Sequence, residues 1–124
     1  MIRVMSELPP GVLGFEARGK VTAQDYQTIM MPEINRAVSG GDRLRMVYHL
    51  GPEFKGFTVG AMFDDAIAGV GHVKSWERAA VVSDIDWIHK SFGFFNALMP
   101  MAMRLFPNSE LDTAVAWAMG KDDA

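Results

Sequence analysis

The three histidines of the chain, His49, His72 and His89, are the side chains best suited to metal binding or to proton transfer near neutral pH. A metal site needs further ligands at a set spacing, such as His-x-x-x-His on one face of a helix. The histidines fall in three different expected elements, and neither His-x-x-x-His nor Glu-x-x-His spacing surrounds them. We therefore expect no metal site and no resident cofactor.

Paired carboxylates are the second group that could do chemistry, and they occur at Asp64-Asp65 and at Asp84 with Asp86. General acid and base catalysis needs two groups that converge on one cleft, whereas adjacent residues of a helix point about 100° apart. Asp64 and Asp65 are therefore expected on a solvated helix face. Asp84 and Asp86 follow a strand pattern, so one of them is expected to cap the next helix.

Nucleophile and phosphate-binding motifs do not occur in the sequence. It has no Gly-x-Ser-x-Gly elbow, and the glycines within residues 51–60 match neither the dinucleotide-binding nor the Walker pattern. An enzymatic function would have to use His49, Glu53 and Asp84, which stand at expected strand ends. We expect a chain without enzymatic activity, with an unrecognised enzyme as the alternative.

Composition restricts the possible classes of protein. The chain has 124 residues, of which 49% are hydrophobic, and this is enough for one core. We expect a single domain over residues 1–120 and a flexible tail over 121–124. The net charge is −3 and the basic residues are scattered, so nucleic acid is not an expected partner.

The absence of cysteine excludes disulfide bonds and thiolate zinc sites. Pro9-Pro10 interrupts the place where a signal peptide would need an apolar run, and no segment has the roughly 18 apolar residues of a membrane span. We expect a cytoplasmic protein.

Periodicity and chain breakers predict alternating strands and helices. Thr22 and Asp25 form a variant capping box for a helix that ends at Gly40-Gly41, and Pro32 predicts a kink or a second helical segment. Asn108 and Ser109 are candidate caps for a last helix. The expected strands are Ile2–Met5, Val12–Arg18, Leu44–Leu50, Arg78–Ser83 and Met103–Phe106, and further helices are expected over residues 59–70 and from Asp84 towards Pro100.

This order predicts an α/β fold. An N-terminal β-hairpin is followed by βαβα units, and right-handed crossovers make the later strands parallel. We expect a mixed, mostly parallel five-stranded sheet backed by about four helices. Leu44–Leu50 and Arg78–Ser83 should be neighbouring central strands, and Gly51-Pro52 should end the first of them.

The chain resembles the SpoIIAA-like family of STAS-type domains. The likeness covers nearly the whole chain and is carried by the order of several short motifs, namely Gly56-Phe57-Thr58, Asp64-Asp65, His72, Trp76, Arg78-Ala79-Ala80-Val81-Val82, Trp87, Arg104-Leu105-Phe106 and Ala114 to Trp117. The resemblance implies a fold akin to the bacterial anti-anti-sigma factors and, more distantly, to the lipid-carrying CRAL-TRIO domains. It implies no particular activity.

Thr58 stands approximately where regulated relatives of this kind carry a phosphorylated serine. The resemblance thus offers one alternative function, a phosphoregulated protein-interaction switch. The Asp-x-Ser setting of those relatives is missing, and a threonine before a helix can act simply as its N-cap. We also consider a weak anion site formed by His49, Lys55 and the helix start at Thr58.

The segment from Trp87 to Met103 is more apolar than a helix on one core requires. Ile88, Phe92, Phe95, Met99 and Ala102 form one stripe, and a second stripe is formed by Trp87, Phe94, Leu98 and Met101. The second stripe needs its own cover: this domain, a second subunit or a lipophilic ligand. We expect a binding or interaction domain that uses this stripe to hold a lipophilic small molecule or a protein partner, with a homodimer as one form.

Overall fold

The computed structural model describes residues 1–41, 43–60, 75–98 and 102–120. Five strands form one sheet in the order β1-β2-β3-β4-β5. β1 and β2 are antiparallel, and β2, β3, β4 and β5 are parallel. The strands are β1 (Ile2–Val4), β2 (Leu13–Val21), β3 (Leu44–Phe57), β4 (Trp76–Val82) and β5 (Ala102–Phe106). The predicted mixed sheet, its N-terminal hairpin and the parallel pairing of its two central segments are confirmed.

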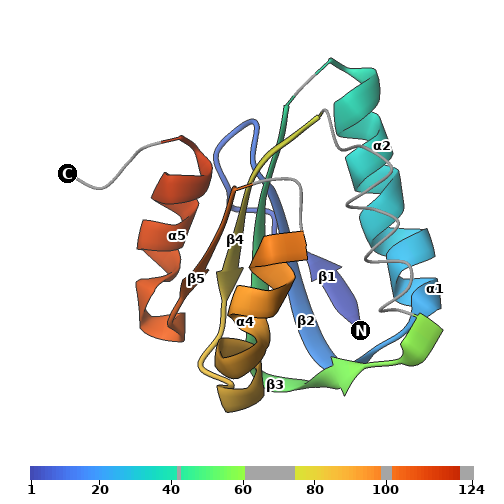
Figure 1. The fold of residues 1–124 in the computed structure, drawn as a ribbon. Coiled ribbons are helices and arrows are strands. Elements are labelled where there is room, and N and C mark those ends of the chain that lie inside the picture. The colour runs from blue at the N-terminus through green and yellow to red at the C-terminus, as the bar shows by residue number, and fades with distance from the viewer. Residues whose placement is uncertain (42, 61–74, 99–101, 121–124) are drawn as a thin grey trace.

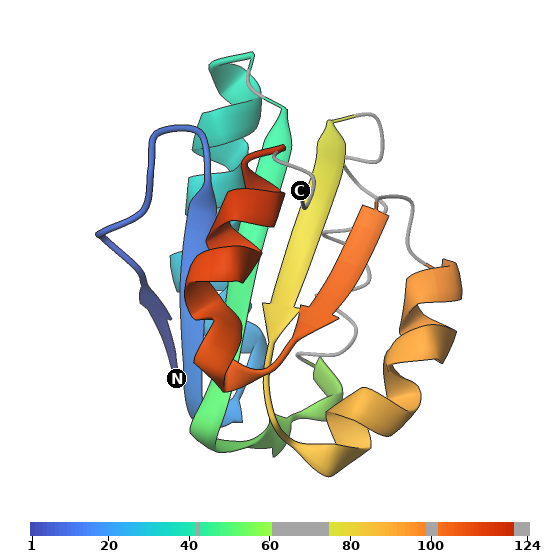
Figure 2. The same ribbon diagram turned by 90° about the vertical axis from the view of Figure 1, so that its left-hand side faces the viewer.

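Helices cover both faces of the sheet, as Figures 1 and 2 show. The helical segments are α1 (Ala23–Asp25), the π-helical turn η1 (Tyr26–Met30), α2 (Met31–Ser39), α4 (Asp86–Leu98), the 3₁₀ turn η2 (Asn108–Glu110) and α5 (Leu111–Ala118). α1, η1 and α2 cover one face, and α5 covers the other. α4 lies beside β5, at the end of the sheet. The helix predicted over residues 59–70 falls, beyond Gly60, outside the described residues.

The first helical region follows its sequence signals. Thr22 accepts a hydrogen bond from the Asp25 N–H, and the Asp25 carboxylate accepts one from the Thr22 N–H, which is the predicted capping box. Pro32 lies in the first turn of α2, after the π-helical turn. The backbone stays helical through Met30 and Met31, so the π-helical turn is the local change in hydrogen bonding that precedes the proline. The predicted restart at Pro32 is confirmed.

β3 is longer than predicted, because Gly51-Pro52 does not end it. The pairing of β3 with β2 passes from Leu50–Ala17 to Phe54–Gly19, so three residues of β3 stand opposite Arg18 alone. This bulge takes up the proline, and β4 no longer pairs with β3 there, since the last paired residues are His49 and Val82. The prediction of a strand end at Leu50 was wrong, because Gly51 and Pro52 form part of a bulge and the strand continues beyond them.

The alternation of side chains along the strands builds two cores. Phe15, Tyr48 and Val81 are buried towards α1, η1 and α2, together with the hydroxyl-to-hydroxyl contact of Tyr26 and Tyr48 at 3.0 Å. Towards α5 the strands contribute Val47, Ala80, Val82 and Phe106, which contact Ala114, Trp117 and Ala118. No helix of the described residues is long and apolar enough to span a bilayer.

Candidate functional site

α4 exposes two large aromatic side chains while it buries another part of its circumference. Trp87 is 47% exposed and Phe94 is 67% exposed, whereas Ile88 is 6% exposed and belongs to the core. Phe92 is partly buried against the same core. The predicted division of this helix into an inward and an outward stripe is therefore visible at these four residues. The side chain of Leu98 and the whole of Met101, which complete the predicted outward stripe, lie outside the described part of the chain.

Trp87 and Phe94 lie seven residues apart, which is about two helical turns, so they fall on one side of α4. Ser91 lies between them, and its hydroxyl donates to the Trp87 carbonyl oxygen at 2.8 Å. Asp86 and Lys90 pair at the edge of this side, with 3.0 Å between Oδ2 and Nζ. We call Trp87, Ser91 and Phe94 the α4 surface. It is apolar, and the charges at its edge are balanced within the helix.

The Trp87 ring extends from α4 towards the far end of β3. Its centroid lies 6.0 Å from that of Phe54, which is buried and contacts Phe57 in turn at 4.9 Å. The extension of β3 beyond its bulge thus supports one end of the α4 surface. This support comes from residues that the sequence pattern placed in a loop.

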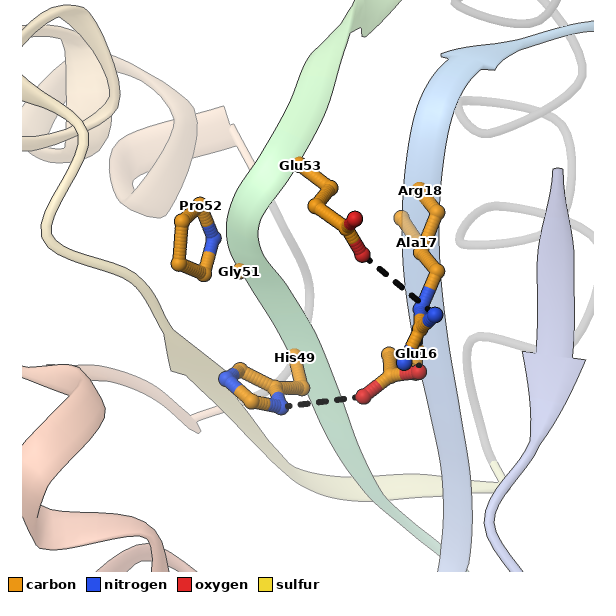
Figure 3. A pocket seen from close by; sticks show the side chains of 7 residues that line it. All are labelled: Glu16, Ala17, Arg18, His49, Gly51, Pro52 and Glu53. Atoms are coloured by element: carbon orange, nitrogen blue, oxygen red, sulfur yellow. Dashed lines mark hydrogen bonds and ion pairs between the residues drawn. The ribbon is translucent and has the colours of Figure 1, made fainter.

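A second group of side chains lies on β2 and β3 near the bulge, level with the carboxyl ends of β4 and β5 (Figure 3). A pocket with a cavity volume of about 80 Å³ is lined by Glu16, Ala17, Arg18, His49, Gly51, Pro52 and Glu53. Glu16 lies directly opposite His49 in the β2–β3 register. We call Glu16, Arg18, His49 and Asn108 the strand-end cluster.

The two carboxylate oxygens of Glu16 have different partners. Oε1 accepts hydrogen bonds from Arg3 at 3.0 Å and from Arg18 at 2.9 Å. Oε2 faces His49 Nδ1 at 3.8 Å, which is too long for a hydrogen bond. Arg18 also pairs with Glu53 at 3.3 Å. The arginines therefore fix Glu16 and leave one of its oxygens directed at the histidine.

His49 links this cluster to the loops that follow β4 and β5. Its Nε2 lies 3.2 Å from Asn108 Oδ1, in η2. The backbone N–H of Asn108 in turn donates to Asp84 Oδ1 at 2.9 Å. Asp84 lies two residues before α4. A continuous series of polar contacts thus runs from β2 to the start of α4.

The predicted cap of the last helix by Asn108 or Ser109 was wrong. A 3₁₀ turn precedes α5, and neither η2 nor α5 has a side-chain cap at its start. The Asn108 side chain faces His49 instead. The Asn108 side chain is therefore engaged across the sheet and not at the start of the last helix.

Of the other two histidines, for which no site was predicted, only His89 lies within the described residues. His89 Nε2 donates to the Ser83 carbonyl oxygen at 2.6 Å, which fixes the first turn of α4 to the preceding loop. His72 lies outside the described residues. Within the described residues, no group of three or more histidine, aspartate or glutamate side chains could hold a metal ion.

The proposed anion site is distributed along β3. His49 lies in the strand-end cluster, Lys55 is exposed beyond the bulge, and Thr58 follows the end of the strand. The N–H of Thr58 donates to the Val21 carbonyl oxygen at 2.9 Å, so this amide is engaged within the protein. The anion-binding or phosphoacceptor role of these three residues stays a prediction.

The sequence reasoning missed Glu16 and Arg18. Both lie on one side of β2, since Phe15 and Ala17 alternate with them and are buried on the other. That alternation marked them as residues of a polar sheet face. Their association with His49 depends on the register of β2 against β3, which the sequence pattern did not contain.

Comparison with known proteins gives a consistent result. The family model described as SpoIIAA-like matches residues 12–119. A crystal structure of an uncharacterized protein of the DUF3478 family, with a SpoIIAA-like fold, from Shewanella loihica PV-4 superposes with a TM-score of 0.75 at 24% sequence identity. The match covers 94% of this chain and 93% of that one, and at this identity it shows the fold alone. No protein with curated annotation matches the chain.

Proposed function

The chain belongs to the SpoIIAA-like family, and on that premise we propose that it is an interaction domain without enzymatic activity that docks a protein surface through α4. The exposure of Trp87 and Phe94 on one side of α4 carries this proposal. Large apolar side chains grouped on a surface are typical of interfaces, and tryptophan and phenylalanine are enriched there.

A protein surface fits α4 better than an enclosed lipophilic ligand does. Two hollows in the described part have cavity volumes of about 80 and 100 Å³, well below the roughly 300–1,000 Å³ of small-molecule pockets. The first is lined by charged groups such as Glu16 and Arg18. Neither hollow includes Trp87 or Phe94 in its lining. These aromatic rings offer an outward surface.

A second copy of the chain is the partner that we propose. The Asp86–Lys90 pair balances its own charges, so two α4 surfaces can approach each other without a net repulsion at this edge. Ser91 already donates its hydroxyl hydrogen within the helix, so its burial would leave no donor unsatisfied. Burial of large side chains such as Trp87 and Phe94 contributes roughly 1.5–3 kcal/mol each, enough to offset part of the entropy cost of association.

Native mass spectrometry with sedimentation velocity tests this proposal, using protein from its own host. We expect a dimer that Phe94→Glu converts to a monomer with an unchanged circular dichroism spectrum. Asn96→Glu is the matched control, because it adds the same charge at another exposed position of α4 and should leave the dimer intact. A monomeric native chain, or a retained apolar small molecule that Phe94→Glu releases, would contradict docking to a second copy.

A further inference from the structure

His49 is placed between two hydrogen-bond acceptors. Asn108 Oδ1 lies 3.2 Å from its Nε2, and Glu16 Oε2 lies 3.8 Å from its Nδ1. A neutral imidazole has one N–H group, and only the imidazolium has two. With Nε2–H donated to Asn108, neutral His49 presents a lone pair to the Glu16 carboxylate. Protonation turns that lone pair into a donor.

Charged groups surround His49 and its two acceptors. Glu16 pairs with Arg3 and Arg18, and Arg18 also pairs with Glu53. On the other side of the ring, the backbone N–H of Asn108 donates to Asp84. Together with Glu16 they make three carboxylates and two arginines, so protonated His49 completes a balanced set. The Glu16 side chain is 16% exposed and that of His49 is 18% exposed, so solvent weakens this pair less than it weakens a fully exposed one.

We infer that His49 is a proton-operated link between the sheet and the base of α4, and that it regulates the docking proposed for the α4 surface. This inference rests on the proposed function for its consequence, though not for its chemistry. Protonated His49 donates to both Glu16 on β2 and the Asn108 side chain. The backbone N–H of Asn108 donates to Asp84, two residues before α4. The link orders the start of α4 and so holds Trp87 in place for docking.

His89 provides an internal comparison. Its Nε2 donates to a single acceptor, the Ser83 carbonyl oxygen, at 2.6 Å. One N–H serves that bond in both charge states of the ring. Histidines change charge between about pH 5 and 8, so acidification should alter the contacts of His49 and leave those of His89 unchanged.

Two variants change how the link depends on the proton of His49. Glu16→Gln offers an amide N–H that can donate to the lone pair of neutral His49, so the link is closed without a proton. Its amide oxygen still accepts from Arg3 and Arg18. His49→Phe has no ring nitrogen, so the link is open at every pH.

Nitrogen-15 NMR of the histidine rings and amide hydrogen exchange test the link in the whole protein. In the native chain at pH 8 we expect His49 as the Nε2–H tautomer, and at pH 5.5 both its nitrogens protonated. After correction for intrinsic exchange, protection of the Asn108 backbone N–H should rise about three- to tenfold on acidification. This is the effect expected when one partly exposed hydrogen bond to a charged group is added. Glu16→Gln should reverse the dependence, with the Asn108 N–H more protected at pH 8 than at pH 5.5, because protonated His49 Nδ1 has no lone pair for the glutamine N–H. His49→Phe should be protected at neither pH.

An Nδ1–H tautomer of His49 at pH 8, or equal Asn108 protection at pH 5.5 and 8, would overturn the link. The dimerisation constant of the same samples separates this inference from the proposed function. A native dimer that Phe94→Glu disrupts but pH leaves unchanged would overturn the regulation and support docking. A pH-dependent link in a chain that never dimerises would overturn docking to a second copy and support the chemistry of His49.

Discussion

α4 and α5 are both apolar helices next to a strand of the same sheet, and they use their tryptophans in opposite ways. Trp117 of α5 is 7% exposed, between the sheet and the helix, whereas Trp87 of α4 is 47% exposed. α5 lies across the face formed by Val47, Ala80 and Phe106, whereas α4 lies beside β5. A helix over the middle of a sheet buries its aromatic side chains, and one beside the sheet leaves some of them to solvent.

The sheet also fixes the end of α5. Arg78 donates to the Trp117 carbonyl oxygen at 2.9 Å, and its guanidinium lies 5.0 Å from the centre of the Trp117 ring. Arg45 donates to the Met119 carbonyl oxygen at 2.5 Å. Cationic groups at a helix C-terminus satisfy its free carbonyls and favour its dipole. The contrast suggests that α5 serves stability and α4 serves binding.

The largest expected effect is on the tryptophans themselves. Trp117→Ala should lower the free energy of unfolding by about 3–5 kcal/mol, because it leaves a cavity between α5 and the sheet. Trp87→Ala should cost under about 1 kcal/mol, since half of its side chain already meets solvent. Urea titrations of the two variants give both values. Equal losses would mean that α4 is core and would remove the contrast.

The sequence left open whether the second apolar stripe of α4 is covered within the domain or lies on its surface. The wide apolar pattern around Trp87 and Phe94 showed that α4 had more apolar surface than one core needs, and the exposure of both confirms that much. Trp117 gave the same kind of local signal, yet it is buried by contacts with Phe106 and Arg78. Burial at these sites depends on which strand lies beneath the helix.

The order of the fold was predictable because each element carries its own local signals. The Thr22–Asp25 capping box and the Pro32 restart involve neighbours in the sequence, and both are present. The length of β3 and the partner of Asn108 were not predictable in this way. Both depend on contacts between distant parts of the chain. Pro52 lies in a bulge of β3 opposite Arg18 of β2, and Asn108 contacts His49.

The arginine at the end of α5 should give the next largest effect. Arg78→Met keeps much of the side-chain volume but removes the hydrogen bond to the Trp117 carbonyl and the contact of the cation with the ring. The expected loss is about 1–2 kcal/mol. Arg104→Met is the control, because Arg104 is exposed and lies over the Phe106 ring at 5.1 Å, and the loss of this cation–ring contact should cost less than about 1 kcal/mol. Chemical denaturation that ranks Arg104 above Arg78 would contradict the role of the sheet in fixing α5.

The capped start of α1 gives a smaller effect that depends on pH. Burial opposes the charge of Asp25, but hydrogen bonds from the Thr22 backbone and hydroxyl and the nearby Met1 ammonium outweigh it and hold the pKa of this carboxyl below its ordinary value. The stability that the carboxylate provides is therefore complete above the pKa of Asp25 in the unfolded chain and is lost as pH falls through its lower pKa in the folded chain.

Asp25→Asn should cost about 1 kcal/mol at pH 7, and the gap from the native chain should close as the pH falls below the lowered pKa of Asp25 in the folded chain. Stability curves of both proteins over this range measure the gap. A constant difference at all pH values would show that shape, and not charge, accounts for the effect of Asp25. α4 offers a comparison, because Asp86 in its first turn is exposed and is paired with Lys90 within the helix.

The smallest effect on stability is expected at that exposed pair, and there the two roles of α4 separate. The side chains of Asp86 and Lys90 are 81% and 77% exposed, so Lys90→Ala should change the free energy of unfolding by less than about 0.5 kcal/mol. Lys90→Glu should be nearly as mild for folding.

If two α4 surfaces meet, however, Lys90→Glu places uncompensated acidic groups at both edges of the interface, so the dimer should weaken at low salt and recover partly at high salt. The exchanged pair, Asp86→Lys with Lys90→Asp, restores the balance and should restore the dimer, at a cost of a few tenths of a kcal/mol from the cation in the first turn. Sedimentation at two salt concentrations, run beside the urea titrations, distinguishes a helix that contributes to binding from one that contributes only to the fold, since a purely structural α4 would show the same association in all these variants.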